Sequence, residues 1–263
     1  MAAPYALRMR FSDESLTRRL EQVANAFMLE WLTGTGARLE PFGAAVAAVD
    51  PSRPELDFVN RVYGLWPEDV EHVPQIAALY RRHDVRGWLE LAPCERFGSL
   101  AGVLARAGAG HIGFHTVVHG AASATAAADI EIDDAPDPEL FSDVILRGHG
   151  VPEGARVRDR GSVARWAEIQ SWRLYLARID GDPAGAALLS LDGDIGYLAN
   201  ASTLPAFRGR GVQTALIARR IADAASAGCE TVCSGTAFGS QSQRNLERAG
   251  LQVAYTKAVW RLH

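Results

Sequence analysis

The chain has 263 residues, of which 48% are hydrophobic and 22% charged, a composition typical of a globular protein with a buried core. A formal net charge of −4 at pH 7 argues against a surface built for nucleic acid or an anionic membrane, so any affinity for an anion must be local. Because there is no apolar run long enough to span a membrane, no signal-peptide pattern and only three cysteines, we expect a cytoplasmic protein.

The first half of the chain alternates patterns typical of helices and strands. A helix begins near Ser12-Asp13, repeats apolar residues at helical spacing from Leu16 to Trp31, and ends at the Gly34-Thr35-Gly36 run. Further along, the patterns predict strands over residues 37–49, 57–63, 87–91 and 111–119, and helices over residues 73–83 and 99–107.

Residues 121–128, AASATAAA, are small and featureless, and we interpret them as a junction between a first domain, 1–125, and a second, 129–263. The second half opens with a strand and one or two helices up to about residue 172. It then predicts a hairpin over 174–179 and 184–191, a strand over 195–201, a helix to about residue 227, a strand over 230–234, a helix ending at Gly250, and a last strand over 251–262.

A short repeat links the two halves. FGSLAGVLARAG at 97–108 and FGSQSQRNLERAG at 238–250 both begin Phe-Gly-Ser and end Leu-x-Arg-Ala-Gly, with one residue inserted in the second. Each lies between a predicted strand and another strand. The repeat predicts two copies of one supersecondary plan, and the alternative is a chance similarity of two short helices.

The most informative stretch is LPAFRGRGVQTALIARRI at 204–221, which places two arginines and two glycines directly before a helix. Unpaired N–H groups and the helix dipole make a helix N-terminus partly positive, glycines let a ligand approach the backbone, and arginines add charge. This combination predicts a phosphate or pyrophosphate site, although a solvated turn has the same appearance. The spacing is that of neither a P-loop nor a dinucleotide-binding fingerprint.

The stretch resembles the acetyl-CoA-binding motif of the GNAT acyltransferase superfamily, a strand followed by Arg/Gln-x-x-Gly-x-Gly/Ala and a helix. Here the motif begins at Arg208, and Gln213 departs from it because that position is usually Gly or Ala. The elements over residues 129–263 follow the family's order. The resemblance implies an α/β fold with a mixed, mostly antiparallel central sheet and helices on both faces, present as two copies in tandem.

The resemblance also implies a cofactor and a reaction. Acetyl-CoA or another acyl-CoA is the expected co-substrate, an amine attacks its thioester directly, and no metal is required. The acceptor is the amine of a small molecule or a peptide, no nucleic acid or membrane takes part, and a homodimer is a possible assembly. The residues implied in cofactor binding are Ala201, Ser202, Thr203, Arg208, Gly209, Arg210, Gly211, Val212, Gln213, Thr214, Ser242 and Asn245.

The proton-transfer groups are less well matched. Leu246 stands where many relatives carry a tyrosine that protonates the leaving thiolate, and Gly239 stands where many use an asparagine. Tyr255 is the candidate catalytic substitute, with a structural tyrosine in the sheet as the alternative. No base is assigned. A CoA-binding protein without catalysis, and a binder of another nucleotide such as ATP or NAD, therefore remain alternatives.

The first half lacks the motif at its equivalent position. In YGLWPEDVEHVP, 63–74, acidic residues replace the arginines, no glycine follows Gly64, and Pro74 has no N–H to donate. We predict that this half keeps a GNAT-like shape, binds no CoA and forms a wall of the acceptor cleft, unless it is an unrelated α/β domain. His111, His115 and His119 are interpreted as surface or packed residues in preference to metal ligands.

Overall fold

The computed structural model describes residues 14–123 and 130–262. Most of the junction predicted over 121–128 therefore lies outside the described residues. The strands are β1 (Arg38–Phe42), β2 (Ala45–Val49), β3 (Arg61–Tyr63), β4 (Gly87–Leu91), β5 (Gly110–Ala121), β6 (Glu131–Asp133), β7 (Trp172–Ile179), β8 (Asp182–Asp192), β9 (Ile195–Thr203), β10 (Thr231–Ala237) and β11 (Gln252–Leu262). The α-helices are α1 (Glu14–Thr33), α2 (Val73–Arg82), α3 (Phe97–Arg106), α4 (Pro138–Gly148), α5 (Glu153–Ala164), α6 (Val212–Ser226) and α7 (Gln241–Arg248).

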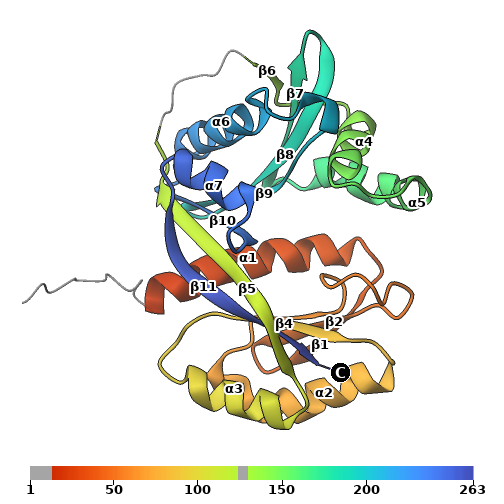
Figure 1. Ribbon diagram of the computed structural model, residues 1–263, viewed down its shortest axis with the longest axis vertical. Helices are drawn as coiled ribbons and strands as arrows, with labels where there is room; N and C mark the ends of the chain where they lie inside the picture. Colours follow the sequence, from red (N-terminus) through yellow and green to blue (C-terminus); the bar gives the residue numbers. More distant parts are fainter. Residues whose placement is uncertain (1–13, 124–129, 263) are drawn as a thin grey trace, which may run out of the picture.

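These strands form one sheet of 11 strands in the order β1-β2-β3-β4-β11-β5-β10-β9-β8-β7-β6 (Figure 1). Neighbouring strands are antiparallel except for the pairs β3–β4 and β9–β10, which are parallel. Helices pack on both faces, as alternation along β7 demonstrates: Tyr175 and Ala177 join the core under α6, whereas Leu174 and Leu176 join the core under α4. The predicted α/β class is confirmed.

The two halves repeat one succession of elements. In the first half β3, a 3₁₀ turn, α2, β4, α3 and β5 follow one another; in the second half β9, a 3₁₀ turn, α6, β10, α7 and β11 do the same. The Phe-Gly-Ser repeat of the sequence falls on α3 and on the segment leading into α7. The two parallel strand pairs occupy equivalent positions in the two copies, so the repeat extends from the sequence to the topology.

The last strand of each copy lies beside the other copy, which the sequence did not predict. β5, which ends the first half, pairs with β10 of the second half, and β11, which ends the chain, pairs with β4 of the first. β5 and β11 also pair with each other at the centre of the sheet. The two halves therefore share a continuous sheet, and each depends on the other for a strand.

Helix α1 joins the halves across one face of this sheet (Figure 1). Its Leu20 and Val23 pack near Val117 of β5 and Tyr255 of β11. Toward its C-terminal end, Leu32 packs with the core beside β2 of the first half. The sequence predicted α1 from the spacing of its apolar residues alone. In the structure the helix covers the boundary, or seam, between the two copies.

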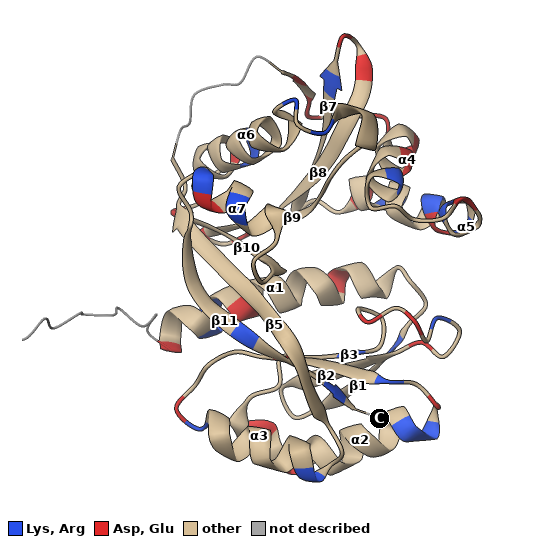
Figure 2. Ribbon diagram, in the orientation of Figure 1, with Lys and Arg blue, Asp and Glu red and all other residues tan. Residues whose placement is uncertain are grey.

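A buried ionic cluster lies at this seam. Figure 2 shows that the central strands β5 and β11 carry few other charged residues. Lys257 Nζ lies 2.7 Å from Glu90 and 3.3 Å from Glu21, and His115 Nδ1 lies 2.6 Å from Glu90. Burial alone would raise the pKa of Glu90, but Lys257 and Arg61 hold it well below its usual value. His115 is thereby explained as a residue whose ring nitrogen contacts a buried carboxylate.

One predicted strand is shorter than expected. Residues 57–60 form a turn, and β3 begins only at Arg61. The Asn60 side chain is buried and donates to the carbonyls of Arg53 and Leu56, while its oxygen accepts from the Asp50 N–H. These bonds hold the segment in a turn although its composition favours a strand.

Candidate functional site

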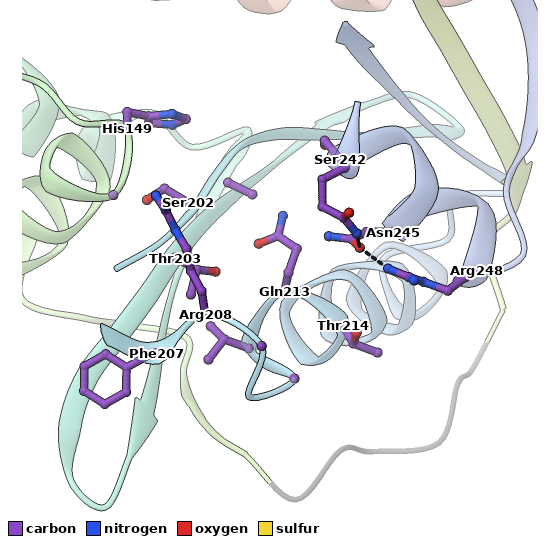
Figure 3. A pocket seen from close by; sticks show the side chains of 16 residues that line it. His149, Ser202, Thr203, Phe207, Arg208, Gln213, Thr214, Ser242, Asn245 and Arg248 are labelled. Carbon is purple, nitrogen blue, oxygen red and sulfur yellow. Dashed lines mark hydrogen bonds between the residues drawn. The ribbon is translucent and has the colours of Figure 1, made fainter. Parts of the chain in front are cut away.

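A cavity of about 590 Å³ opens beside β9, the N-terminus of α6 and one side of α7 (Figure 3). It contains most of the residues predicted to bind the cofactor. Its lining is made by Gly148, His149, Ala201, Ser202, Thr203, Phe207, Arg208, Gly209, Gly211, Val212, Gln213, Thr214, Gln241, Ser242, Asn245 and Arg248.

The cavity exists because β9 and β10 diverge. Their parallel pairing covers residues 195–197 and 231–233 only, and β9 then continues to Thr203 without β10 beside it. The hydroxyl of Ser234 donates to the Leu198 carbonyl at 2.7 Å, at the point where the strands separate. Beyond that bond the open edge of β9 presents backbone groups that an extended ligand can pair with.

β9 also carries a bulge at this point. Ala199 lies opposite Leu188 and Ser202 opposite Ala186, so two residues of β9, Asn200 and Ala201, face a single residue of β8. Asn200 has a φ of 35°, in the left-handed region that few residues other than glycine adopt. A left-handed residue at a strand bulge is a feature that clusters at functional sites.

The turn before α6 has the geometry of an anion site. Gly209 and Gly211 have φ values of 78° and 84°, which explains why both positions are glycine. Gly211 is the N-cap of α6, and no side chain caps its free N–H groups. The first helical turn contains no acidic residue, so the positive end of the helix faces the cavity unopposed.

The two arginines of the turn behave differently. Arg208 lines the cavity, as predicted. Arg210 does not: its guanidinium lies 3.3 Å from the carboxylate of Asp180 and stacks 5.6 Å from the ring centre of Phe207. The structure therefore brings together all the predicted cofactor residues except Arg210.

Helix α7 supplies the opposite wall. Ser242, Asn245 and Arg248 follow one another at intervals of three residues and share one side of the helix. Asn245 Oδ1 accepts hydrogen bonds from both Arg248 and Gln241, which fixes its orientation (Figure 3). Arg248 was not predicted, although its spacing from Asn245 could have identified it.

Gln213 stands at the position where the family motif has a small residue. Figure 3 shows its side chain between Ser202 and Asn245, pointing into the cavity. Its Oε1 is buried and accepts no hydrogen bond from the described residues. A buried acceptor without a partner is unfavourable, so this atom is available for a donor on a ligand.

The C-terminus of α4 completes the cavity, a contact that no motif of the sequence predicted. A Cβ at Gly148 would lie 2.2 Å from Ser202 Oγ, so only glycine lets α4 approach β9 this closely. The next residue, His149, caps the helix and lines the cavity. The residue is exposed at the cavity, and partial desolvation of the ring lowers the pKa of its imidazole below the usual value.

Tyr255 is not brought to the cavity. It is 6% exposed and packs against Leu20 and Val23, and its hydroxyl donates to Glu21 at 2.8 Å. Burial and the Glu21 carboxylate both raise the pKa of Tyr255 far above its usual value. Leu246 is 3% exposed in the core beneath α6. The catalytic role assigned to Tyr255 thus stays a prediction that the cavity does not support.

The equivalent turn of the first half is acidic and occupied. Glu68 lies 2.8 Å from Arg96 and 3.2 Å from Arg18, and Asp69 accepts a hydrogen bond from the Ala44 N–H. Pro74 lies in the first turn of α2 and lacks an N–H group. These contacts agree with the sequence interpretation, and the absence of CoA binding there remains a prediction.

Across residues 14–123 and 130–262, no three histidine, cysteine, aspartate or glutamate side chains gather as metal ligands. The same part of the chain contains no helix with the length and apolar character to cross a membrane.

Comparison with known proteins gives a family match for the second half. Residues 153–242 match the family model of an acetyltransferase (GNAT) domain. No curated protein matches the chain. The solved structures similar to it include a GCN5-related N-acetyltransferase from Kribbella flavida, at 14% identity and a TM-score of 0.63 over 93% of this chain and 94% of that one.

A tandem GNAT protein from the clavulanic acid biosynthesis pathway is similar at 16% identity and a TM-score of 0.56, covering 76% of this chain and 74% of that one. A conserved protein of unknown function from Staphylococcus epidermidis matches at 10% identity and a TM-score of 0.63, covering 86% of this chain and 94% of that one. At these identities the likeness concerns the fold.

Proposed function

We propose that the chain is an acetyl-CoA-dependent N-acetyltransferase. It has the tandem GNAT fold that the sequence resemblance predicted, and the GNAT domain match lies in the second copy. The proposal is supported most directly by one observation: a single cavity gathers a glycine-rich helix N-terminus, an unpaired strand edge and a polar helix face. The helix N-terminus suits a diphosphate, the strand edge suits an extended amide-containing arm, and the polar helix face offers contacts to the cofactor from the opposite wall.

In this proposal the backbone N–H groups of residues 209–214 hold the pyrophosphate of CoA, with Arg208 adding positive charge. The pantetheine arm extends along the open edge of β9, where the backbone of residues 201–203 pairs with its amides. Ser242, Asn245 and Arg248 contact the cofactor from α7. Gln213 offers its free Oε1 to a donor on the arm.

The reaction is a direct acyl transfer. The lone pair of the acceptor amine attacks the thioester carbon, the C–S bond breaks, and CoA leaves as a thiolate that takes up a proton. The bulge at Asn200 lies on the open edge of β9 and provides a backbone N–H for the carbonyl oxygen as it gains charge. Among the described residues that line the cavity, His149 is the candidate base for the amine proton.

A second candidate function is CoA binding without catalysis. It is favoured by the burial of Leu246 at the position where many relatives carry the proton donor, and by the engagement of Tyr255 with Glu21. If the chain is instead a transferase, solvent or a group other than these two residues must protonate the thiolate.

The test is a direct assay of purified protein. Acetyl-CoA is mixed with a panel of small-molecule and peptide amines, and free thiol is measured. Acceptor-dependent thiol release supports the transferase. Tight cofactor binding without thiol release for any amine supports the binder. Greater thermal stabilisation by ATP or NAD than by CoA would reject both in favour of another nucleotide.

A further inference from the structure

Arg220, in the middle of α6, is the most unusual buried side chain of the second half. It is 1% exposed and surrounded by the apolar face of its helix. Its Nε donates to the Leu216 carbonyl at 3.0 Å, and its Nη1 donates to the carbonyls of Leu188 at 3.0 Å and Ala199 at 3.1 Å. Within the described part of the chain, no carboxylate pairs with it.

Its neighbour shows how an arginine is ordinarily accommodated. Arg219 is partly exposed, and its guanidinium pairs with Asp223 at 3.0 Å and also with Asp134. Burying a cation without a counter-ion is costly, and an apolar side chain at position 220 would pack without that cost. Burial lowers the pKa of Arg220 to about 10, so the guanidinium is still charged at pH 7.

The two carbonyls that bind Nη1 flank the bulge of β9. Leu188 and Ala199 are the last opposed pair of β8 and β9 before the register shifts, and Asn200 follows with its left-handed φ. In a planar trans peptide the C=O and the following N–H point in opposite directions. Since the Ala199 carbonyl points to Arg220, the Asn200 N–H points away from it.

The strand geometry gives the direction of that N–H. Along a strand, successive peptide groups point alternately to the two neighbouring strands. The Leu198 carbonyl points toward β10, because it accepts from Ser234, and the Ala199 carbonyl shares Nη1 with the carbonyl of Leu188 in β8. The Asn200 N–H is therefore directed to the β10 side, where the two strands have already separated.

We propose that Arg220 is a positioning residue that fixes and polarises the peptide between Ala199 and Asn200, so that the Asn200 N–H binds the thioester carbonyl of acetyl-CoA. A cation on the carbonyl side of a peptide strengthens its N–H as a donor, and the effect is large in a low-dielectric interior. The inference rests on the proposed function, because it requires the thioester to lie in the gap between β9 and β10.

The experiment measures the thioester carbonyl directly. Full-length protein is saturated with acetyl-CoA carrying ¹³C at the carbonyl, and the carbonyl stretch is recorded by isotope-edited infrared spectroscopy. We compare wild type with Arg220→Met, Arg220→Lys and the matched control Arg219→Met. The stretch is expected at lower frequency in wild type and in the control than in free acetyl-CoA. It should return toward the free value in Arg220→Met and partly in Arg220→Lys, which keeps the charge.

Kinetics with an acceptor found by the amine panel give a second readout. Loss of a polarised donor should lower kcat about 10-fold or more in Arg220→Met while the Kd for CoA stays close to wild type. A wild-type carbonyl frequency in Arg220→Met, with acetyl-CoA bound, overturns the inference and leaves the transferase proposal standing. Failure of wild type to bind acetyl-CoA instead rejects the proposed function itself.

A measurement on wild type covers the case in which Arg220→Met does not fold. The amide proton of Asn200 is followed by NMR in complexes with CoA and with acetyl-CoA. A downfield shift specific to acetyl-CoA, reduced in Arg220→Lys, is the expected result. Equal resonances in the two complexes would show that this N–H does not bind the acyl carbonyl and would overturn the inference.

Discussion

Gly211→Glu is the sharpest perturbation of the proposed cofactor site, because it places a carboxylate at the N-cap of α6 where the pyrophosphate is expected. A carboxylate about 4 Å from one phosphate charge is repelled by about 1 kcal/mol in water and about 4 kcal/mol at an effective dielectric constant of about 20. Since about 1.4 kcal/mol is a factor of ten in affinity, the Kd for CoA should rise about 5-fold to about 1,000-fold.

The backbone contributes separately. Gly211 has a φ of 84°, and a residue with a side chain costs about 1–2 kcal/mol of conformational energy in that region. Gly228, with a φ of 90°, follows the other end of α6 and provides a control for this strain. A helix of 15 residues is about 22 Å long, beyond the Debye length of about 8 Å, so Gly228→Glu does not act on the cofactor.

The assay is isothermal titration calorimetry of CoA with wild type, Gly211→Glu and Gly228→Glu, after circular dichroism has established that all three fold. We expect weak or undetectable binding in Gly211→Glu and wild-type affinity in Gly228→Glu. Wild-type affinity in Gly211→Glu would refute the placement of the pyrophosphate. An equal loss in both variants would mean that helix stability, and not charge at the N-cap, controls binding.

Three further predictions concern the base, the buried tyrosine and the ionic cluster. His149→Gln should lower kcat/KM and remove from its pH profile an ionisation below the usual histidine value of 6.5, and an unchanged profile would exclude His149 as the base. Tyr255→Phe should leave turnover close to wild type. Unfolding in urea should report a loss of about 1–3 kcal/mol, because the buried Glu21 loses the Tyr255 hydroxyl and, among the described residues, keeps only Lys257 as a partner. A large loss of kcat with intact stability would restore Tyr255 as the acid. Glu90→Gln should lower the free energy of unfolding by about 3–5 kcal/mol at pH 7, because it leaves Lys257 and Arg61 buried with one carboxylate fewer. The pKa of Glu90 is depressed in the folded state, so the stability that its carboxylate contributes is present above its unfolded pKa and is lost as the pH falls through the folded pKa. In urea titrations, the difference in the free energy of unfolding between wild type and Glu90→Gln should therefore shrink below about pH 4. A difference that stays constant with pH would contradict this.

The sequence by itself determined the local features of the site. The φ values of Gly209 and Gly211, the start of α6 and the spacing of Ser242 and Asn245 on α7 depend on contacts between near neighbours, and all were predictable. The succession of helices and strands followed from apolar periodicity for the same reason. These features were sufficient to identify the GNAT resemblance and most of the residues that line the cavity.

The tertiary structure alone decided which distant segments meet. His149 reaches the cavity because Gly148 packs against Ser202 of β9, and Arg220 meets the bulge because α6 crosses β8 and β9. The exchange of β5 and β11 between the two copies likewise depends on pairing across more than 100 residues. Local composition carries no record of such pairings, because strand partners are chosen by the packing of the whole sheet.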